Sequence, residues 1–278
     1  MPQEKAVRSC HNRFIGYGQS TVDPPFPPRV LHAHETCEIF CIFRGNGYYI
    51  TEGTRHKFEH GKIFLMRSGE SHRPDLIGDE PYTRMALHFD PEVVDGIDPE
   101  RKLLRPFFDR PLGLHNVYDR SVAAQTEIYE LFRKMTVLSG DNYKDCLHVT
   151  ALLFAVLDEL CTLFDAGLYN SPTESAALMH DVVAYVNENL TARLSIEQIC
   201  EKFYLSRGQL NRSFKSSTGA TVWDYIVTKR LVMAKSYISD GMSAQEAARA
   251  SGFSDYSAFY RAYLKKNGVT PTGNTRTL

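Results

Sequence analysis

The stretch "LSIEQICEKFYLSRGQLNRSFKSSTG" (194–219) decides the fold of the C-terminal third, because it predicts two short helices joined by a tight break. Ser195 and Ser206 are good N-cap residues and stand directly before the two amphipathic runs. Leu210 and Phe214 lie four residues apart, which places both on the buried side of the second helix. The opposite side of that helix carries the polar and basic residues Arg207, Gln209, Asn211, Arg212 and Lys215.

A second stretch, "MSAQEAARASGFSDYSAFYRAYLKKNG" (242–268), repeats this arrangement. Ser243 caps a short helix, and Phe259 and Tyr263 form the buried pair of the helix that follows. Between the two units, residues 221–239 predict one helix about 28 Å long at ~1.5 Å per residue. Such a helix can hold both units over successive major grooves, which lie ~34 Å apart. The exposed side of the last helix carries Tyr256, Ser257, Tyr260, Arg261 and Lys265.

Two helix-turn-helix units with polar outer faces indicate a protein that binds double-stranded DNA. The second helix of such a unit enters the major groove with its N-terminal residues at the base edges. Arg, Gln and Asn read guanine and adenine edges, and lysines suit phosphates. Residues 175–278 carry 13 Lys and Arg against 8 Asp and Glu, a net charge of +5, whereas the whole chain has a net charge of −1. A basic segment on an acidic remainder agrees with contact to a polyanion.

The sequence before residue 91 has the pattern of β-structure. "CEIFCIF" and "GYYITEG" alternate between the two faces of a strand and are rich in Ile, Phe and Tyr. The frequent turns between such short strands are typical of a small sandwich or barrel. Apolar residues at helical spacing then predict helices over residues 121–135 and 141–164.

The stretch "HAHETCE" (32–38) brings two histidines and a carboxylate together. His32 and His34 share one face of a strand, and Glu38 follows four residues later. With His72 they form a donor set that suits Zn, Ni, Fe or Mn. The same side chains could instead hydrogen-bond the hydroxyls of a sugar or simply line a wet barrel mouth, and these interpretations stay open. The expected metal ligands are His32, His34, Glu38 and His72, and the expected small-molecule ligands are these four with Arg44 and Tyr48.

The run 194–271 resembles the DNA-binding domain of AraC/XylS-type bacterial transcription regulators. The resemblance rests on the first unit, "RLVMA" (230–234), "GFSDYSAFYRAY" (252–263), Gly268 and Pro271. Leu264 departs from the family pattern, which usually has a lysine there, and this weakens the expected phosphate contacts. The resemblance implies that bases are contacted from the positions Arg207, Gly208, Asn211, Arg212, Tyr256, Ser257, Tyr260 and Arg261.

The stretch "HAHETCEIFCIFRG" resembles the cupin pattern through His32, His34, Glu38 and Gly45. A second cupin pattern is nearly met by "GKIFLMRSGESH", with Arg67 in place of proline. Many AraC-type regulators are similar at their sensing end. The resemblance implies a ligand-responsive regulator whose effector is a sugar or sugar derivative, whose helices 121–164 form a homodimer, and which works with RNA polymerase. The alternative is a metal-dependent cupin enzyme with a helical accessory domain. We expect no enzyme, because the fused DNA-binding domain already accounts for the function of the chain.

We therefore expect a multidomain fold. It comprises a small all-β cupin-like barrel with helices, followed by an all-α domain with two helix-turn-helix units joined by a long helix. The expected boundaries are 1–115 for the barrel, 116–168 for a helical dimerisation segment, 169–175 for a linker and 176–278 for the DNA-binding domain.

The chain is expected to be cytoplasmic and to make no membrane contact. No apolar run approaches the ~20 residues needed to span a bilayer. The first residues lack the hydrophobic core of a secretory signal. The six cysteines form no C-x-x-C pair and are expected to be free thiols of a reducing compartment.

Overall fold

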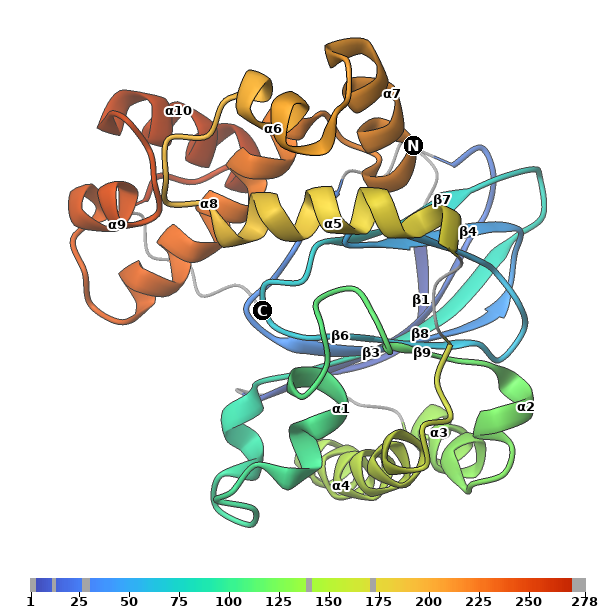
Figure 1. Cartoon of the computed structure of the whole chain (residues 1–278). Helices are drawn as coiled ribbons and strands as arrows, with labels where there is room; N and C mark the ends of the chain where they lie inside the picture. The colour runs from blue at the N-terminus through green and yellow to red at the C-terminus, as the bar shows by residue number, and fades with distance from the viewer. Residues whose placement is uncertain (1–3, 12–13, 27–30, 139–141, 171–173, 272–278) are drawn as a thin grey trace.

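The computed structural model describes residues 4–11, 14–26, 31–138, 142–170 and 174–271, and it places a β-domain between two groups of helices (Figure 1). Helices from residues 105–165 lie on one side of the β-domain. Helices from residue 174 onward lie on the other side. The expected multidomain fold, all-β and then all-α, is confirmed.

Two antiparallel sheets form the β-domain. The smaller sheet has the order β5 (Thr54–Lys57), β4 (Gly47–Thr51) and β7 (His72–Leu76). The larger sheet has the order β1 (Glu4–His11), β2 (Ile15–Val22), β8 (Tyr82–Phe89), β3 (Cys37–Arg44), β6 (Ile63–Met66) and β9 (Val117–Tyr118). Because β9 pairs with β6, the larger sheet continues past residue 115, where we expected the barrel to end.

The space between the two sheets is filled by side chains. Strand alternation turns Phe40 and Ile42 of β3 inward, whereas Ile39 and Cys41 face the helices behind the larger sheet. The inward side chains from both sheets form one packed cluster of Val22, Phe40, Ile42, Tyr49, Phe58, Phe64, Met66, Tyr82, Ala86 and Val117.

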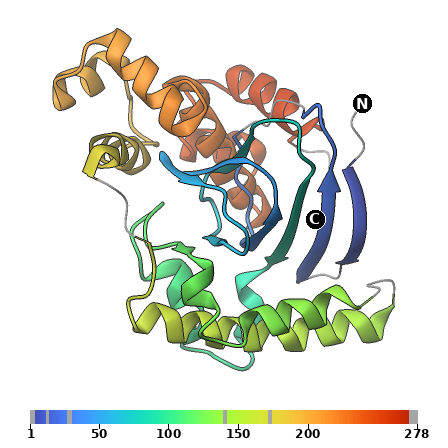
Figure 2. The same ribbon diagram turned by 90° about the vertical axis from the view of Figure 1, so that its right-hand side faces the viewer.

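A helical layer covers the outer face of the larger sheet (Figure 2). Its longest member is α4 (Tyr143–Asp165), which among the described residues is the one helix long and apolar enough to cross a membrane by length and composition alone. Its buried residues, Val149, Leu153, Val156, Leu157, Leu160 and Leu163, pack into the core beneath the sheet. The remaining elements of this layer are η1 (Pro91–Val94), η2 (Lys102–Leu104), α1 (Arg105–Phe108), α2 (Arg120–Ala123) and α3 (Ile128–Thr136).

Two expectations for this half of the chain are wrong. The helix expected over residues 121–135 is broken into α2 and α3. The Thr126 hydroxyl donates to the carbonyl of Ala123 at 2.9 Å and accepts from the N–H of Ile128 at 3.3 Å, so it replaces helical hydrogen bonds. Cys146 is disulfide-bonded rather than a free thiol, whereas Cys37, Cys41, Cys161 and Cys200 are free. Spacing alone carried no sign of this bond.

The C-terminal helices follow the predicted pattern. The first unit is α6 (Ile196–Phe203) and α7 (Arg207–Thr218), and the second is α9 (Ala244–Ala250) and α10 (Tyr256–Asn267). The long helix α8 (Val222–Ser239) joins them, and α5 (Glu174–Glu188) precedes them. The proposed linker 169–175 lies partly outside the described residues, and the domain boundaries remain predictions.

Candidate functional site

Each reader helix begins with a side-chain cap. At α7, Ser206 Oγ accepts the N–H of Gln209 at 3.3 Å, and Gln209 Oε1 accepts the N–H of Ser206 at 3.0 Å. This reciprocal pair is a capping box, and Ser195 and Ser243 build the same motif at α6 and α9. Gln209 was expected to read bases, but its side-chain oxygen is occupied by the cap. Only its amide N–H groups remain for a base edge.

The predicted DNA readers lie on the solvent side of α7 and α10. Leu210 and Phe214 of α7 and Phe259 and Tyr263 of α10 are buried on the opposite side, as predicted. Tyr260 is half-buried. The other predicted readers are exposed, namely Arg207, Gln209, Asn211, Arg212, Lys215, Tyr256, Ser257, Arg261 and Lys265.

A buried arginine on α8 fastens the two units together. Arg230 donates from Nε to the carbonyl of Leu190 at 2.7 Å and from Nη2 to the carbonyl of Ala192 at 3.0 Å. Gly252, at the turn of the second unit, has φ +91, and a Cβ there would lie 2.5 Å from the Leu190 carbonyl. The close approach requires glycine. The segment before the first unit therefore contacts both α8 and the turn of the second unit.

The histidines converge around one carboxylate at the end of the β-domain. His34 Nε2 lies 3.1 Å and His72 Nε2 lies 3.0 Å from the same oxygen of Glu38, Oε2. The other oxygen, Oε1, lies 3.6 Å from His88 Nε2. His32 packs its ring on His72, with 4.4 Å between the ring centroids. Glu38 and His72 are buried, whereas the His34 and His88 side chains are 24% and 38% exposed, so the cluster opens to solvent on one side.

The tautomers of two of these histidines follow from their backbone partners. His34 Nδ1 lies 2.8 Å from the carbonyl oxygen of Thr36, and His72 Nδ1 lies 2.8 Å from that of Glu70. A carbonyl only accepts, so each Nδ1 carries a proton and donates it to its carbonyl, which leaves Nε2 of each ring facing Glu38. Nε2 of His72 is buried and, among the described residues, lacks a hydrogen-bond partner of good geometry. This arrangement fits a divalent metal ion, whose ligating histidines commonly donate their other N–H to a carbonyl.

Charge is concentrated on Glu38. Burial alone would raise the pKa of Glu38, but the nearby His88 and the close contacts of His34 and His72 with its carboxylate outweigh it and hold that pKa well below its usual range. Burial would lower the pKa of His72, but its contact with Glu38 raises it. Burial lowers the pKa of His88 to about 4. The lowered pKa keeps the Glu38 carboxylate ionised, and its charge attracts a cation or hydrogen-bond donors.

The structure places three residues of this region differently from the arrangement expected from the sequence. His88 was not among the expected ligands, yet it stands opposite Glu38 in the β3–β8 register and joins the donor set. Arg44 lies six residues along β3 from Glu38, which is roughly 20 Å at ~3.3 Å per residue, and it is exposed. Tyr48 faces outward, where the Arg55 guanidinium lies 3.6 Å above its ring, because alternation turns its neighbour Tyr49 inward to stack on His72.

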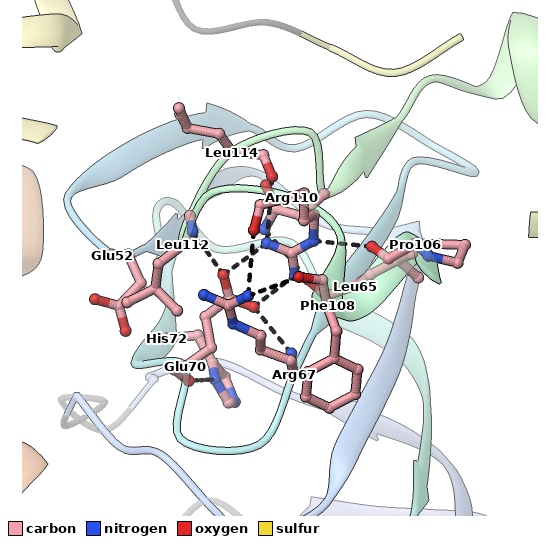
Figure 3. Close-up of polar contacts among 12 residues, drawn as sticks. Glu52, Leu65, Arg67, Glu70, His72, Pro106, Phe108, Arg110, Leu112 and Leu114 are labelled. Carbon is pink, nitrogen blue, oxygen red and sulfur yellow. Dashed lines mark hydrogen bonds and ion pairs between the residues drawn. The ribbon is translucent and has the colours of Figure 1, made fainter. Parts of the chain in front are cut away.

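The loop that carries His72 is fixed by a buried ion pair (Figure 3). Arg110 donates from Nη1 and Nη2 to the two oxygens of Glu70 at 2.8 and 2.7 Å, and both side chains are fully buried. Glu70 also accepts the backbone N–H groups of Arg67 at 2.9 Å and Gly113 at 2.6 Å. Both oxygens of the carboxylate are therefore paired, and Glu70 anchors the loop two residues before His72.

The chain matches two family models. Residues 15–157 match a model described as the AraC-like ligand binding domain, and residues 199–276 match a helix-turn-helix domain. The HTH-type transcriptional activator RhaR of Enterobacter sp. (strain 638) is 23% identical over 263 residues, which cover 93% of this chain and 92% of the relative. RhaR of Mannheimia succiniciproducens is 23% identical over 90% of this chain and 87% of that protein. Among solved structures, ToxT from Vibrio cholerae strain SCE256 with bound unsaturated fatty acid is 14% identical, with a TM-score of 0.40 over 96% of this chain and 99% of that one.

Proposed function

Since the chain belongs to the AraC family of transcription regulators, with an AraC-like ligand binding domain before a helix-turn-helix domain, we propose that it controls transcription in response to a small molecule at the histidine cluster. The observation that carries the proposal is the convergence of His34, His72 and His88 on Glu38 in the ligand-binding half of the chain. The relatives are transcription regulators, so the enzyme alternative is set aside, as expected.

The effector is a small polar molecule, such as a sugar or sugar derivative. Hydroxyl groups can donate to the Glu38 carboxylate and exchange hydrogen bonds with the imidazole rings of His34 and His88, which lie at the open side of the cluster. The packed aromatic interior between the sheets favours binding at this open end over binding deep in the barrel. Arg44 and Tyr48, expected to bind the same ligand, are left out of this proposal because they lie away from the cluster.

A divalent metal ion is the second candidate for the cluster. His34, Glu38 and His88, whose ligand atoms lie within 4.8 Å of one another, would hold it, and His72 and His32 lie beside them. Zn, Ni, Fe and Mn all accept imidazole and carboxylate ligands. Such an ion would supply a positive charge that draws in hydroxyl or carboxylate oxygens of the effector.

Elemental analysis of untagged protein separates these two forms of the site. A bound metal predicts about one equivalent in the wild type and its loss from His34→Ala/His88→Ala, with His148→Ala, on exposed α4 surface, as the control. Equal metal content in all three would refute the metal site. If a sugar raises the melting temperature of the wild type but not that of the double variant, direct binding of the sugar to the histidine cluster is supported. If the double variant is stabilised as well, the effector binds elsewhere.

The active form is proposed to be a homodimer that binds DNA in the cytoplasm and works with RNA polymerase. The outer face of α4 leaves Leu147 52% exposed and Tyr143 83% exposed, which suits a second copy packing along the 121–164 helices. A dimer would present four readers to repeated half-sites. Analytical ultracentrifugation of Tyr143→Glu/Leu147→Glu tests the interface, because a wild-type dimer and a monomeric variant are expected.

A further inference from the structure

The segments that carry the sensing histidines also touch the DNA-binding domain. His32 and His72 pair through two backbone hydrogen bonds of 3.2 and 2.8 Å, and the N–H of Gly69 donates to the carbonyl of His34 at 2.8 Å. The segments 31–35 and 67–73 are therefore tied to each other. Leu31, which precedes the first histidine, packs into the core formed by the α5–α8 helices.

Glu52 joins this loop to the DNA-binding domain. It lies in the turn between β4 and β5 and is 1% exposed. Its Oε1 accepts from the N–H of Ser71 at 2.5 Å and from Lys229 Nζ at 2.8 Å. Its Oε2 accepts from Asn187 Nδ2 at 3.0 Å and from the hydroxyl of Tyr225. One carboxylate thus holds α5 and α8 against the peptide next to His72 (Figure 3 shows Glu52 and His72 beside the loop).

Glu52 and Lys229 are both held in energetically costly positions in this contact. Glu52 has φ +45, a left-handed conformation that is unfavourable for a residue with a Cβ and persists only where its surroundings demand it. Lys229 Nζ also donates to the carbonyl of Gly69 at 2.6 Å and is 7% exposed. A buried lysine held by one carboxylate and one loop carbonyl is costly to keep unless both stay in place.

We propose that Glu52, with Lys229 and Tyr225, is a latch that keeps the DNA-binding domain docked on the β-domain, and that the histidine cluster controls this latch through the 69–72 peptide. The proposal rests on the proposed function, because it names how the state of the sensing site is transmitted to the DNA-binding domain. An effector that moves His72 also moves the adjacent Ser71, whose N–H donates to the Glu52 carboxylate. The docked and released states therefore differ in affinity for the effector.

Docking of the DNA-binding domain on the β-domain lowers its affinity for DNA. Residues 1–174 carry 19 Lys and Arg against 25 Asp and Glu, a net charge of −6, whereas the DNA-binding part is +5. Holding an acidic body beside the DNA-binding helices weakens the attraction of the readers to phosphates. Release of the latch therefore raises DNA affinity, and the gain shrinks as salt screens the charges.

The first test compares Glu52→Gln and Lys229→Met with Glu130→Gln, which alters an exposed carboxylate paired with Arg133 on α3. Small-angle scattering of the full chain measures docking, and fluorescence anisotropy on a DNA fragment selected by the protein measures affinity. Both latch variants are expected to increase the radius of gyration and to bind DNA about five-fold or more tightly. The Glu130 variant is expected to match wild type. Unchanged scattering, or release without a change in affinity, would overturn the latch.

A disulfide staple separates release from misfolding. A Cβ on Gly53 would lie 3.7 Å from the Cβ of Val183 on α5, close to the ~3.8 Å of disulfides. Because Gly53 has φ +84, Gly53→Cys/Val183→Cys in the otherwise wild-type chain, kept reduced, is the control for backbone strain. Gly53→Cys/Val183→Cys in the Glu52→Gln background should restore low DNA affinity when oxidised and lose it again on reduction. An oxidised staple that leaves the high affinity in place would contradict the proposal, even if Glu52→Gln alone behaves as expected.

Transmission from the histidines is tested without any ligand. His72→Ala is expected to release the domain as Glu52→Gln does, whereas His88→Ala, on β8 of the same cluster, is expected to stay docked. Equal scattering for the two variants would refute the route through the loop. A failure to bind zinc or sugar would count against the proposed function alone, because none of the latch measurements uses an effector.

Discussion

Replacing Arg110 with methionine should destabilise the chain strongly, because it leaves Glu70 charged and buried. The Arg110 guanidinium donates hydrogen bonds of 2.7–3.2 Å to the two Glu70 oxygens and to the carbonyls of Pro106, Leu65 and Leu114. Removing one partner of a fully buried pair costs about 3–5 kcal/mol, much of it the cost of the charge left behind. Glu70→Gln in the same background removes that charge, so the double variant should be more stable than Arg110→Met alone.

The assay is urea unfolding followed by circular dichroism at pH 7, with Arg105→Met as the matched control. Arg105 lies in the same segment and pairs with Asp109 and Asp165 at 3.2 and 2.9 Å, but it is 43% exposed. Surface pairs of this kind contribute about 0–1 kcal/mol. A loss for Arg110→Met no larger than the loss for Arg105→Met would refute the reasoning.

The pH dependence of these variants gives a second, sign-sensitive check. In the wild type, burial would raise the pKa of Glu70, but the charge and hydrogen bonds of Arg110 outweigh it and lower that pKa. The wild type therefore keeps this stabilisation above the unfolded pKa of about 4.3 and loses it as pH falls through the lower folded value. Without Arg110, burial raises the pKa of Glu70, so protonation relieves the variant and its deficit should shrink between pH 7 and 4.5. A constant deficit across that range would contradict the assignment.

Three further outcomes follow from the reader units and the smaller sheet. Arg212→Ala should cost about 1–3 kcal/mol of DNA-binding free energy and relax the base preference, whereas Lys265→Ala should weaken binding to all sequences alike and lower the slope of log affinity against log salt concentration by about 1. Fluorescence anisotropy at several salt concentrations measures both effects. An equal effect of Arg212→Ala on every sequence would argue against base reading. Ser206→Ala should cost about 0.5–2 kcal/mol in thermal unfolding, against roughly 0.5 kcal/mol or less for the exposed Ser213→Ala; matching losses would dismiss the cap. Burial lowers the pKa of His56 to about 4, so stability should fall as pH drops from about 6.5 to 4, and His56→Phe should flatten that slope in melting experiments; an unchanged slope would dismiss the shift.

The helical half of the chain was predictable because its signals are local. Caps, buried i, i+4 pairs and closing glycines all lie within a few residues of one another, so Ser206, Leu210 and Phe214 were assigned correctly from the sequence. Gln209 shows the limit of such reasoning, because a glutamine can either complete a capping box or read a base, and the local sequence fits both roles.

The β-domain site was only partly predictable, because it depends on strand register. The pattern His-x-His with Glu38 identified one side of the cluster, but His88 meets Glu38 only through the β3–β8 pairing. Glu52 and Lys229 are 177 residues apart, and nothing near either one marks their contact. The outward side of Tyr48 likewise follows from the phase of a strand, which an alternating run of aromatic residues leaves ambiguous.

The solid aromatic packing between the two sheets has a consequence for how such a sensor can diversify. A hollow barrel changes its ligand by reshaping its core, and each change risks an empty or overfilled space. Here the core is closed by residues such as Phe40, Tyr49 and Phe64, and the polar groups stand on segments at its end. New ligand preferences can therefore arise by substitution at the rim while the scaffold keeps its melting point, and a designed library should vary His32, His34 and their neighbours and leave the interior untouched.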